Sequence, residues 1–227
     1  ARCNLIVSYT ADDKGYELMS GLIKELIDKL SAEQLPVATR ALTLKKTRLA
    51  LKTSGQVNFV CRVGDYDKAG IEYNGAMRIL ANMMNSDYLW NNIRVKGGAY
   101  GCGAAFGSYS SSLGAFSSYR DPNLEKTNEI YDKAPEYVES FNADEREMTK
   151  YVIGTISDLD LPKTPSVKGS DSFEAYISGL TEQMLQKERD EVLGATVEDI
   201  RALSGMVKAV LDDGYFCVVG NEDKINE

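Results

Sequence analysis

The chain has 227 residues, of which 43% are hydrophobic and 26% charged, a balance typical of a globular protein, and its formal net charge is −8. No apolar run is long enough to cross a bilayer, and an acidic chain lacks the basic surface that binds nucleic acid. The absence of histidine excludes serine–histidine–aspartate and cysteine–histidine catalysis, and any histidine-based zinc site, within this chain. We therefore expect neither a membrane nor a nucleic acid as partner, and an intracellular, cytoplasmic location.

The beginning of the chain and its cysteines give two further expectations. The first residue is alanine and a strand-like run follows at once, so we expect the chain to be a piece of a longer protein. The cysteines form no C-x-x-C pair, and each lies in a run that predicts a strand: Cys3, Cys61, Cys102 and Cys217. Buried, reduced thiols are the favoured interpretation, and two disulfides are the alternative.

Periodicity in the first part of the chain predicts both strands and helices. Alternating apolar and polar residues predict strands, whereas an apolar residue every three or four positions predicts a helix. Strands are predicted over 2–9, 47–53 and 56–63, and helices over 13–30 and 71–85. Ser54 and Gly55 separate the last two strands, so we expect a hairpin there. Pro36 interrupts any helix over 31–46.

The stretch 87–109, DYLWNNIRVKGGAYGCGAAFGSY, changes character at its middle. After a break at Asn85-Ser86 it begins as a short helix, crosses Gly97 and Gly98, and continues as a strand of small residues. Glycine in a strand often marks a place where a ligand or another backbone comes close. A phosphate-binding loop has glycines that lead into a helix, whereas here the helix comes first, so we reject a nucleotide site.

The last part of the chain predicts mainly helices. The glycine-rich strand and a strand over 113–120 are expected to form a hairpin through a turn at Ser110 to Ser112. A helix follows Asp121-Pro122 and is expected to kink at Pro135. The remaining predictions are a helix over 143–158 capped by Asn142 and Glu145, a loop over 159–169, a helix over 170–193, a helix capped by Thr196 to Asp199, and a strand over 215–219.

About six strands in pairs and seven helices indicate an α+β fold. We expect a two-layer sandwich in which a mainly antiparallel sheet is covered by helices. No internal repeat or linker is visible, so residues 1–227 are predicted to form a single domain.

Arg94 and Tyr100 flank the glycine pair, and both can donate hydrogen bonds. Arginine holds a carbonyl oxygen or an oxyanion with a fixed fork of donors, and tyrosine adds one hydroxyl donor. Both could point at one extended peptide whose backbone lies near Gly97 and Gly98. Spacing alone leaves open the alternative that Arg94 caps its own helix and Tyr100 belongs to the core.

The segment LWNNIRVKGGAYG resembles a signature in the C-terminal half of the insulinase (pitrilysin-like) zinc metallopeptidases, and is most similar to the presequence-protease branch. The segment VIGTISDLDLPKTPSVKG, over 152–169, resembles the same branch. The resemblance covers most of the chain and is weakest over the first forty-odd residues. The inverted zinc motif of the family, H-x-x-E-H, is absent from this chain.

The resemblance implies a role for the chain as part of a peptidase. Family chains carry four related α+β domains, and this chain would be the last of them. Zinc and its general base would belong to the missing N-terminal half of the same polypeptide, and this chain would hold no metal. Arg94 and Tyr100 would reach the active site and stabilise the tetrahedral intermediate, while unstructured peptides would be the substrates. This chain alone would be inactive.

A second interpretation is a non-catalytic scaffold or binding domain of the same fold, because some relatives in the family keep the fold and lose the chemistry. The retained Arg94, Gly97, Gly98 and Tyr100 favour the enzyme. An inverted zinc motif upstream in the same gene would distinguish the two.

Overall fold

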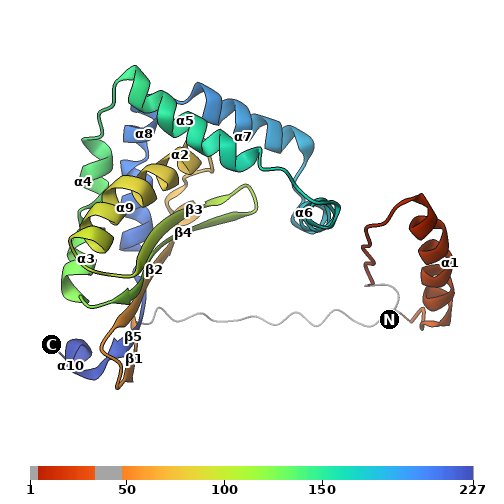
Figure 1. Cartoon of the computed structure of the whole chain (residues 1–227), viewed down its shortest axis with the longest axis horizontal. Helices are drawn as coiled ribbons and strands as arrows, with labels where there is room; N and C mark the ends of the chain where they lie inside the picture. Colours follow the sequence, from red (N-terminus) through yellow and green to blue (C-terminus); the bar gives the residue numbers. More distant parts are fainter. Residues whose placement is uncertain (1–4, 34–47, 227) are drawn as a thin grey trace. The chain divides into compact units, whose positions relative to one another are not determined.

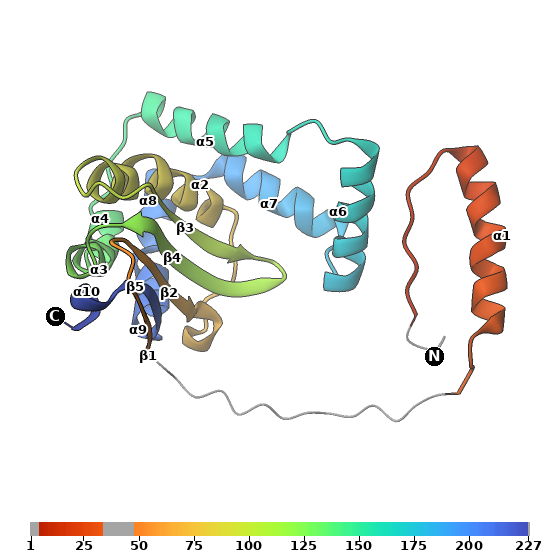
Figure 2. The same ribbon diagram turned by 60° about the horizontal axis from the view of Figure 1, so that its bottom comes forward.

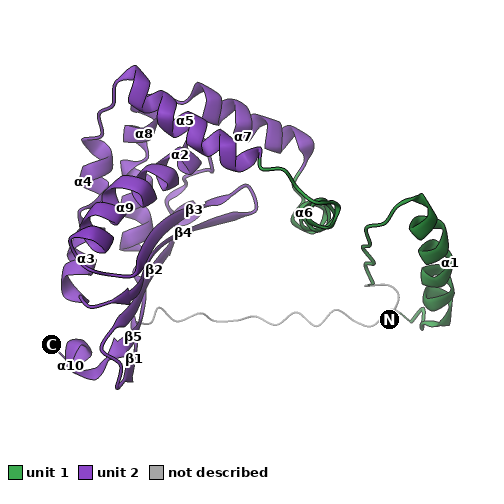
Figure 3. Cartoon of the chain, viewed as in Figure 1, with its two compact units in different colours: residues 1–44, 161–180 green, residues 45–160, 181–227 purple. Residues whose placement is uncertain are grey.

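A computed structural model describes residues 5–33 and 48–226 (Figures 1 and 2). Contacts divide the chain into two compact units, one formed by 1–44 with 161–180 and the other by 45–160 with 181–227 (Figure 3). The sequence contains no composition change that marks these boundaries. That residues 1–227 form one C-terminal domain of a four-domain peptidase stays a prediction.

The larger unit is built on one sheet of five strands in the order β1-β5-β2-β4-β3. The strands are β1 (Arg48–Thr53), β2 (Asn58–Asp65), β3 (Gly101–Ser108), β4 (Ser111–Asp121) and β5 (Tyr215–Asn221). Only β1 and β5 run parallel; the other three pairs are antiparallel. The predicted α+β class and mainly antiparallel sheet are confirmed, and the sheet has five strands in the described residues where about six were expected.

One strand and one hairpin predicted near the beginning of the chain are not found. Of the predicted strand 2–9, residues 5–9 form no strand, and the remainder lies outside the described residues. The expected hairpin between β1 and β2 does not form, because β5 lies between them and pairs with both. Alternation indicates that a segment is extended, but the choice of partner strand depends on residues far away in sequence. The irregular segment predicted over 31–46 lies mostly outside the described residues.

Helices of the larger unit cover one face of the sheet, as Figures 1 and 2 show for α2 and α9. The other face carries half-buried and exposed side chains. The described helices of this unit, whichever part of it they occupy, are η2 (Tyr66–Ala69), α2 (Ala76–Met83), η3 (Met84–Tyr88), η4 (Trp90–Val95), α3 (Glu125–Asp132), α4 (Ala134–Glu139), α5 (Glu145–Leu159), α7 (Glu182–Gly194), α8 (Val197–Ala202), α9 (Ser204–Asp212) and α10 (Glu222–Asn226). The two-layer arrangement is therefore confirmed, with α5 packed on α2 away from the sheet.

Close packing of α9 against the sheet explains two glycines of the strands. Gly64 on β2 and Gly114 on β4 face Val210 of α9, and a Cβ atom at either position would overlap Val210. Val210 is itself fully buried. Because neither glycine carries a side chain, the helix lies directly on the backbone of the neighbouring strands β2 and β4.

Several helix boundaries differ from the prediction for local reasons. Asp144, not Asn142, caps α5 by accepting from the Glu147 amide. The predicted helix 170–193 is two helices, because Gly179 adopts a left-handed conformation (φ 73°) that ends the first of them. That first helix, α6 (Pro165–Ser178), begins inside the predicted loop 159–169, with Pro165 in its first turn.

Other local predictions are confirmed. Thr196 and Asp199 form a reciprocal capping box at the start of α8. The helix expected around Pro135 is interrupted at Lys133, which separates α3 from α4. The glycine-rich strand and its neighbour form the predicted hairpin, β3 with β4.

The smaller unit contains α1 (Asp13–Lys29) and α6. The helix predicted over 13–30 is confirmed, and Asp12 caps it by accepting from the Gly15 amide. None of its residues is buried, so the apolar stripe that includes Leu18 and Leu22 is exposed in the described part of the chain.

Candidate functional site

The helix that leads to the glycine pair continues α2 in a π-helical form. The predicted break at Asn85-Ser86 is wrong, because η3 and η4 carry the helix on to Val95. The wider turn is visible in the bond from the Lys96 amide to the Asn91 carbonyl, at 3.1 Å. Such π-helical turns are frequent at functional sites, and here η4 contains Arg94 and leads into Gly97, Gly98 and Tyr100.

Gly97 and Gly98 are both required by the turn that follows. A Cβ at Gly97 would lie 2.5 Å from the Ile93 carbonyl oxygen, and Gly98 has a φ of 80°, which favours glycine. The Gly97 carbonyl accepts a bond of 2.6 Å from the Asn123 side-chain amide. These contacts explain the glycines structurally, and their role in binding a peptide stays a prediction.

The turn brings Arg94 of η4 beside Tyr100 at the start of β3. The Arg94 guanidinium carbon lies 5.9 Å from the centre of the Tyr100 ring and 5.8 Å from the ring of Trp90. Tyr100 is 66% exposed, which excludes the alternative that it belongs to the core. Trp90 is also exposed, whereas Leu89 beside it is fully buried and anchors the helix.

Both side chains have donors that other described residues do not use. No carboxylate within the described ranges pairs with Arg94, and no acceptor there bonds the Tyr100 hydroxyl. A cation–π contact at an exposed site is worth about 0.5–1 kcal/mol. Hydrogen bonds to charged groups contribute about 1.5–3 kcal/mol. A hydrogen bond from Arg94 to a charged ligand oxygen can therefore offset the loss of both ring contacts.

Sequence reasoning missed Arg120, which also lies against Tyr100. Its guanidinium carbon is 6.0 Å from the centre of the Tyr100 ring, and its side chain is exposed. A β-bulge sets Tyr119 and Arg120 of β4 opposite the single residue Phe59 of β2. No sequence pattern indicates this bulge. Arg120 has a φ of 49°, a conformation in which glycine is usual, so an arginine at this position does not signal it.

The bulge also completes a row of aromatic rings on the uncovered face of the sheet. The ring centres of Tyr100 and Tyr119 are 5.8 Å apart, and those of Tyr119 and Phe59 are 5.2 Å apart, both edge to face. Gly101 and Gly103 of β3 lie on the same face and leave the backbone bare beside this row. An extended chain could therefore lie against the rings and close to the glycine backbone.

Asn85 holds the outer edge of β3 next to this face. Its side-chain nitrogen donates to the Ala104 carbonyl at 3.0 Å, and its oxygen accepts from the Ala104 amide at 2.6 Å. The amide thus imitates the peptide group of a neighbouring strand, which satisfies part of an otherwise unpaired edge.

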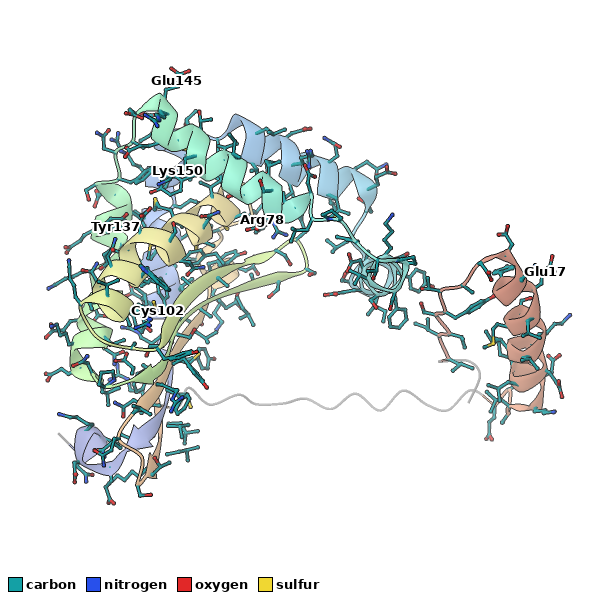
Figure 4. All side chains as sticks on the ribbon, in the orientation of Figure 1. Glu17, Arg78, Cys102, Tyr137, Glu145 and Lys150 are labelled. Carbon is teal, nitrogen blue, oxygen red and sulfur yellow. The ribbon has the colours of Figure 1, made fainter. Side chains whose placement is uncertain are left out.

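Three cysteines lie in the sheet as free thiols: Cys61, Cys102 and Cys217. They are half-buried, not fully buried as predicted, and Cys3 lies outside the described residues. Burial and the nearby Asp121 carboxylate raise the pKa of Cys102, labelled on β3 in Figure 4, while the Arg94 backbone acts in the opposite direction. Burial raises the pKa of Cys61 as well, and Cys217 opposite it adds to this effect. Cys61 and Cys102 are therefore weak nucleophiles at neutral pH.

The residues present do not fit a zinc ion. The chain has no histidine, and no three metal-binding side chains come together in the described residues. A catalytic zinc site needs three protein ligands and an open position. We also find, within the described residues, no helix with the length and apolar character to span a membrane.

Comparison with known proteins identifies the family of this arrangement. The model of the PreP C-terminal domain matches residues 48–221, which include the strands β1 to β5 and the whole junction around Gly97. This chain belongs to the PreP C-terminal domain family. The resemblance to the presequence-protease branch is thereby confirmed, and the chain is a domain of a protease family.

Two relatives cover the whole PreP C-terminal domain. Protein HypA of Clostridium perfringens is 41% identical over 225 residues, which are 99% of this chain and 23% of HypA. Presequence protease 1, chloroplastic/mitochondrial, of Arabidopsis thaliana is 32% identical over 231 residues, which are 100% of this chain and 21% of that protein. The chain therefore spans less than a quarter of the length of either relative.

A solved structure has the same fold as this PreP C-terminal domain at low identity. A protease from Helicobacter pylori superposes with a TM-score of 0.63 over 93% of this chain and 52% of that chain, at 15% identity. At this identity the comparison concerns the fold alone.

Proposed function

We propose that this chain is the C-terminal substrate-binding domain of a zinc-dependent metalloendopeptidase that degrades unstructured peptides. The observation that carries the proposal is the pair formed by half-buried Arg94 and exposed Tyr100, whose side-chain donors have no hydrogen-bond or carboxylate partner among the described residues. The pair stands on a rigid turn in a domain of a protease family. The metal is expected in another part of the longer protein.

The proposed chemistry is stabilisation of charge on the carbonyl oxygen of the cleaved peptide bond. Arg94 offers several N–H donors in one plane, and Tyr100 offers one O–H donor. Both are held before the substrate arrives, so little reorganisation is needed when the oxygen becomes negative. The bare backbone of Gly97 and Gly98 is proposed to admit the extended peptide beside them.

The test replaces each donor in the full-length protein. Arg94→Ala and Tyr100→Phe are each expected to lower turnover of a fluorogenic peptide on the order of a hundred- to a thousandfold, the usual effect of losing one oxyanion donor. The zinc content of both variants is expected to equal that of the unchanged protein, because neither residue is proposed to bind metal.

Tyr119→Phe is the matched control, since it removes a hydroxyl from the neighbouring ring that is not proposed to hold the oxyanion. Its turnover should stay near normal. Near-normal cleavage by both Arg94→Ala and Tyr100→Phe would contradict the proposal and favour a non-catalytic scaffold or binding domain.

A further inference from the structure

A bulge in β4 brings Arg120 to the candidate site, and the local sequence does not predict this position. The bulge places it next to Tyr119, and its left-handed backbone (φ 49°) is unfavourable for a residue with a side chain. It is the only non-glycine residue with a positive φ in the described part of the chain. Such outliers persist only where surrounding contacts determine the backbone, and they cluster at ligand sites.

Buried contacts of the following residue hold this backbone. The next residue, Asp121, is fully buried, and its carboxylate accepts from the Asn123 amide at 2.9 Å and from the Thr127 hydroxyl at 2.7 Å. The Asn58 side chain donates to the Asp121 carbonyl at 3.0 Å. The position of Arg120 is therefore determined by the fold and not by its own side chain.

The Arg120 side chain has a cation–π contact with Tyr100 and no carboxylate partner in the residues described. Arg94 lies against the same ring, so two guanidinium groups stand at about equal distance from one phenol. In a chain with a net charge of −8, the exposed Arg120 and the half-buried Arg94 are a local concentration of positive charge, since neither has an acidic partner among the described residues. A guanidinium with free N–H edges matches the geometry of a carboxylate.

We propose that Arg120 binds a carboxylate of the substrate peptide and thereby determines specificity. This inference rests on the proposed function, in which Arg94 and Tyr100 hold the carbonyl of the cleaved bond. Both guanidinium groups lie about 6 Å from the Tyr100 centre. Roughly four residues of extended peptide span the greatest separation this allows. The carboxylate therefore belongs to an aspartate or glutamate within about four residues of the cleaved bond, or to the end of a peptide cut near its C-terminus.

The experiment compares matched peptides with the full-length protein. One peptide carries a single glutamate at successive positions within about four residues of the cleaved bond, and its partner carries glutamine there; both have an amidated C-terminus. A third peptide has glutamine and a free C-terminus close to the cleaved bond. The first and third peptides distinguish the two sources of the carboxylate.

Unchanged protein is expected to cleave at least one carboxylate peptide with a higher kcat/KM than the amidated glutamine peptide. Arg120→Gln should reduce that preference by roughly tenfold or more, as the loss of a charge-assisted hydrogen bond does. Arg120→Lys, which keeps the charge and loses the planar fork, should retain part of the preference. Arg146→Gln is the control, because it removes an exposed arginine from α5 without changing the site.

Arg120→Gly keeps the inference testable if glutamine disturbs the backbone, because glycine accepts a positive φ. Equal losses of kcat/KM on the carboxylate peptides and on the amidated glutamine peptide would overturn the inference. An unchanged preference for a carboxylate in both Arg120→Gln and Arg120→Gly would overturn it as well. If Arg94→Ala lowers the cleavage of all three peptides while the Arg120 variants keep the preference for a carboxylate, only the proposed role of Arg120 fails. If Arg94→Ala and Tyr100→Phe leave all three unaffected, the proposed function itself fails.

Discussion

At the scale of single residues, asparagine side chains near the candidate site make hydrogen bonds to backbone groups in place of another backbone segment. Asn85 does so at the edge of β3, where its amide makes the two bonds that another strand would make. Asn123 does so at the turn, where its side-chain amide donates to the Gly97 carbonyl. These contacts fix backbone on both sides of Tyr100 in the chain, at Gly97 before it and at Ala104 after it.

Replacing Asn85 by aspartate should destabilise the domain. The carboxylate cannot donate to the Ala104 carbonyl and sets a negative oxygen against it, so the free energy of unfolding should fall by about 1–3 kcal/mol. Urea unfolding of this chain can be followed through the fluorescence of Trp90, its single tryptophan, which lies in the neighbouring η4.

Asn91→Asp is the matched control, because Asn91 is exposed and its side chain makes no hydrogen bond with any described residue. It adds the same charge to the same helical segment. An equal shift of the unfolding midpoint in both variants would show that charge, and not the bonds to Ala104, causes the loss.

At the scale of elements, the sheet and α9 meet through glycines. Gly64 and Gly114 leave room for Val210, and the helix thereby reaches the backbone of β2 and β4. The same two strands carry the bulge that sets Arg120 beside Tyr100. Packing on the covered face therefore supports the strands whose opposite face presents the candidate site.

Gly64→Ala should destabilise this packing. The added methyl group would overlap the Val210 backbone, which cannot rotate away as a side chain could, so a loss of about 1–3 kcal/mol in unfolding free energy is expected. Gly205→Ala, in α9 itself, has nothing within reach of its new Cβ and should stabilise the helix by about 0.5–1 kcal/mol. Urea unfolding of both variants measures the two effects, and a gain for Gly64→Ala would contradict this account of the packing.

At the scale of the whole molecule, the described residues present hydrogen-bond donors at the candidate site, but no group of three side chains among them could hold a metal ion. The free thiols at Cys61, Cys102 and Cys217 lie within the sheet, and no histidine is available to join them. The chain also spans less than a quarter of the length of two relatives that it matches from end to end. We accordingly expect the metal and the remaining catalytic groups elsewhere in a longer polypeptide.

Purified, tag-free chain is expected to bind no stoichiometric zinc and to cleave no peptide. Metal analysis by mass spectrometry after dialysis, together with a fluorogenic peptide assay, tests both statements. The full-length protein is the positive control for each measurement. One tightly bound zinc ion per isolated chain would refute the assignment of the metal to another part of the protein.

Much of the local structure could be predicted because its causes are local. Thr196 and Asp199 are three residues apart and cap one helix by bonding each other, so their spacing alone indicates the cap. The helix, glycine pair and strand around Arg94 and Tyr100 could be predicted in the same way. The boundary at Gly179 was missed because glycine occurs inside helices as well as at their ends, and spacing does not separate these cases.

The sequence by itself determined the family of this domain and its α+β class, and it indicated Arg94 and Tyr100 as candidate site residues, because short motifs and periodicity carry that information. Only the tertiary structure decided that β5 lies between β1 and β2, and that Arg120 reaches Tyr100. Strand partners are chosen by residues more than a hundred positions apart. The bulge at Arg120 is held by contacts from Asn58 and Asp121, so no local pattern in the sequence could reveal it.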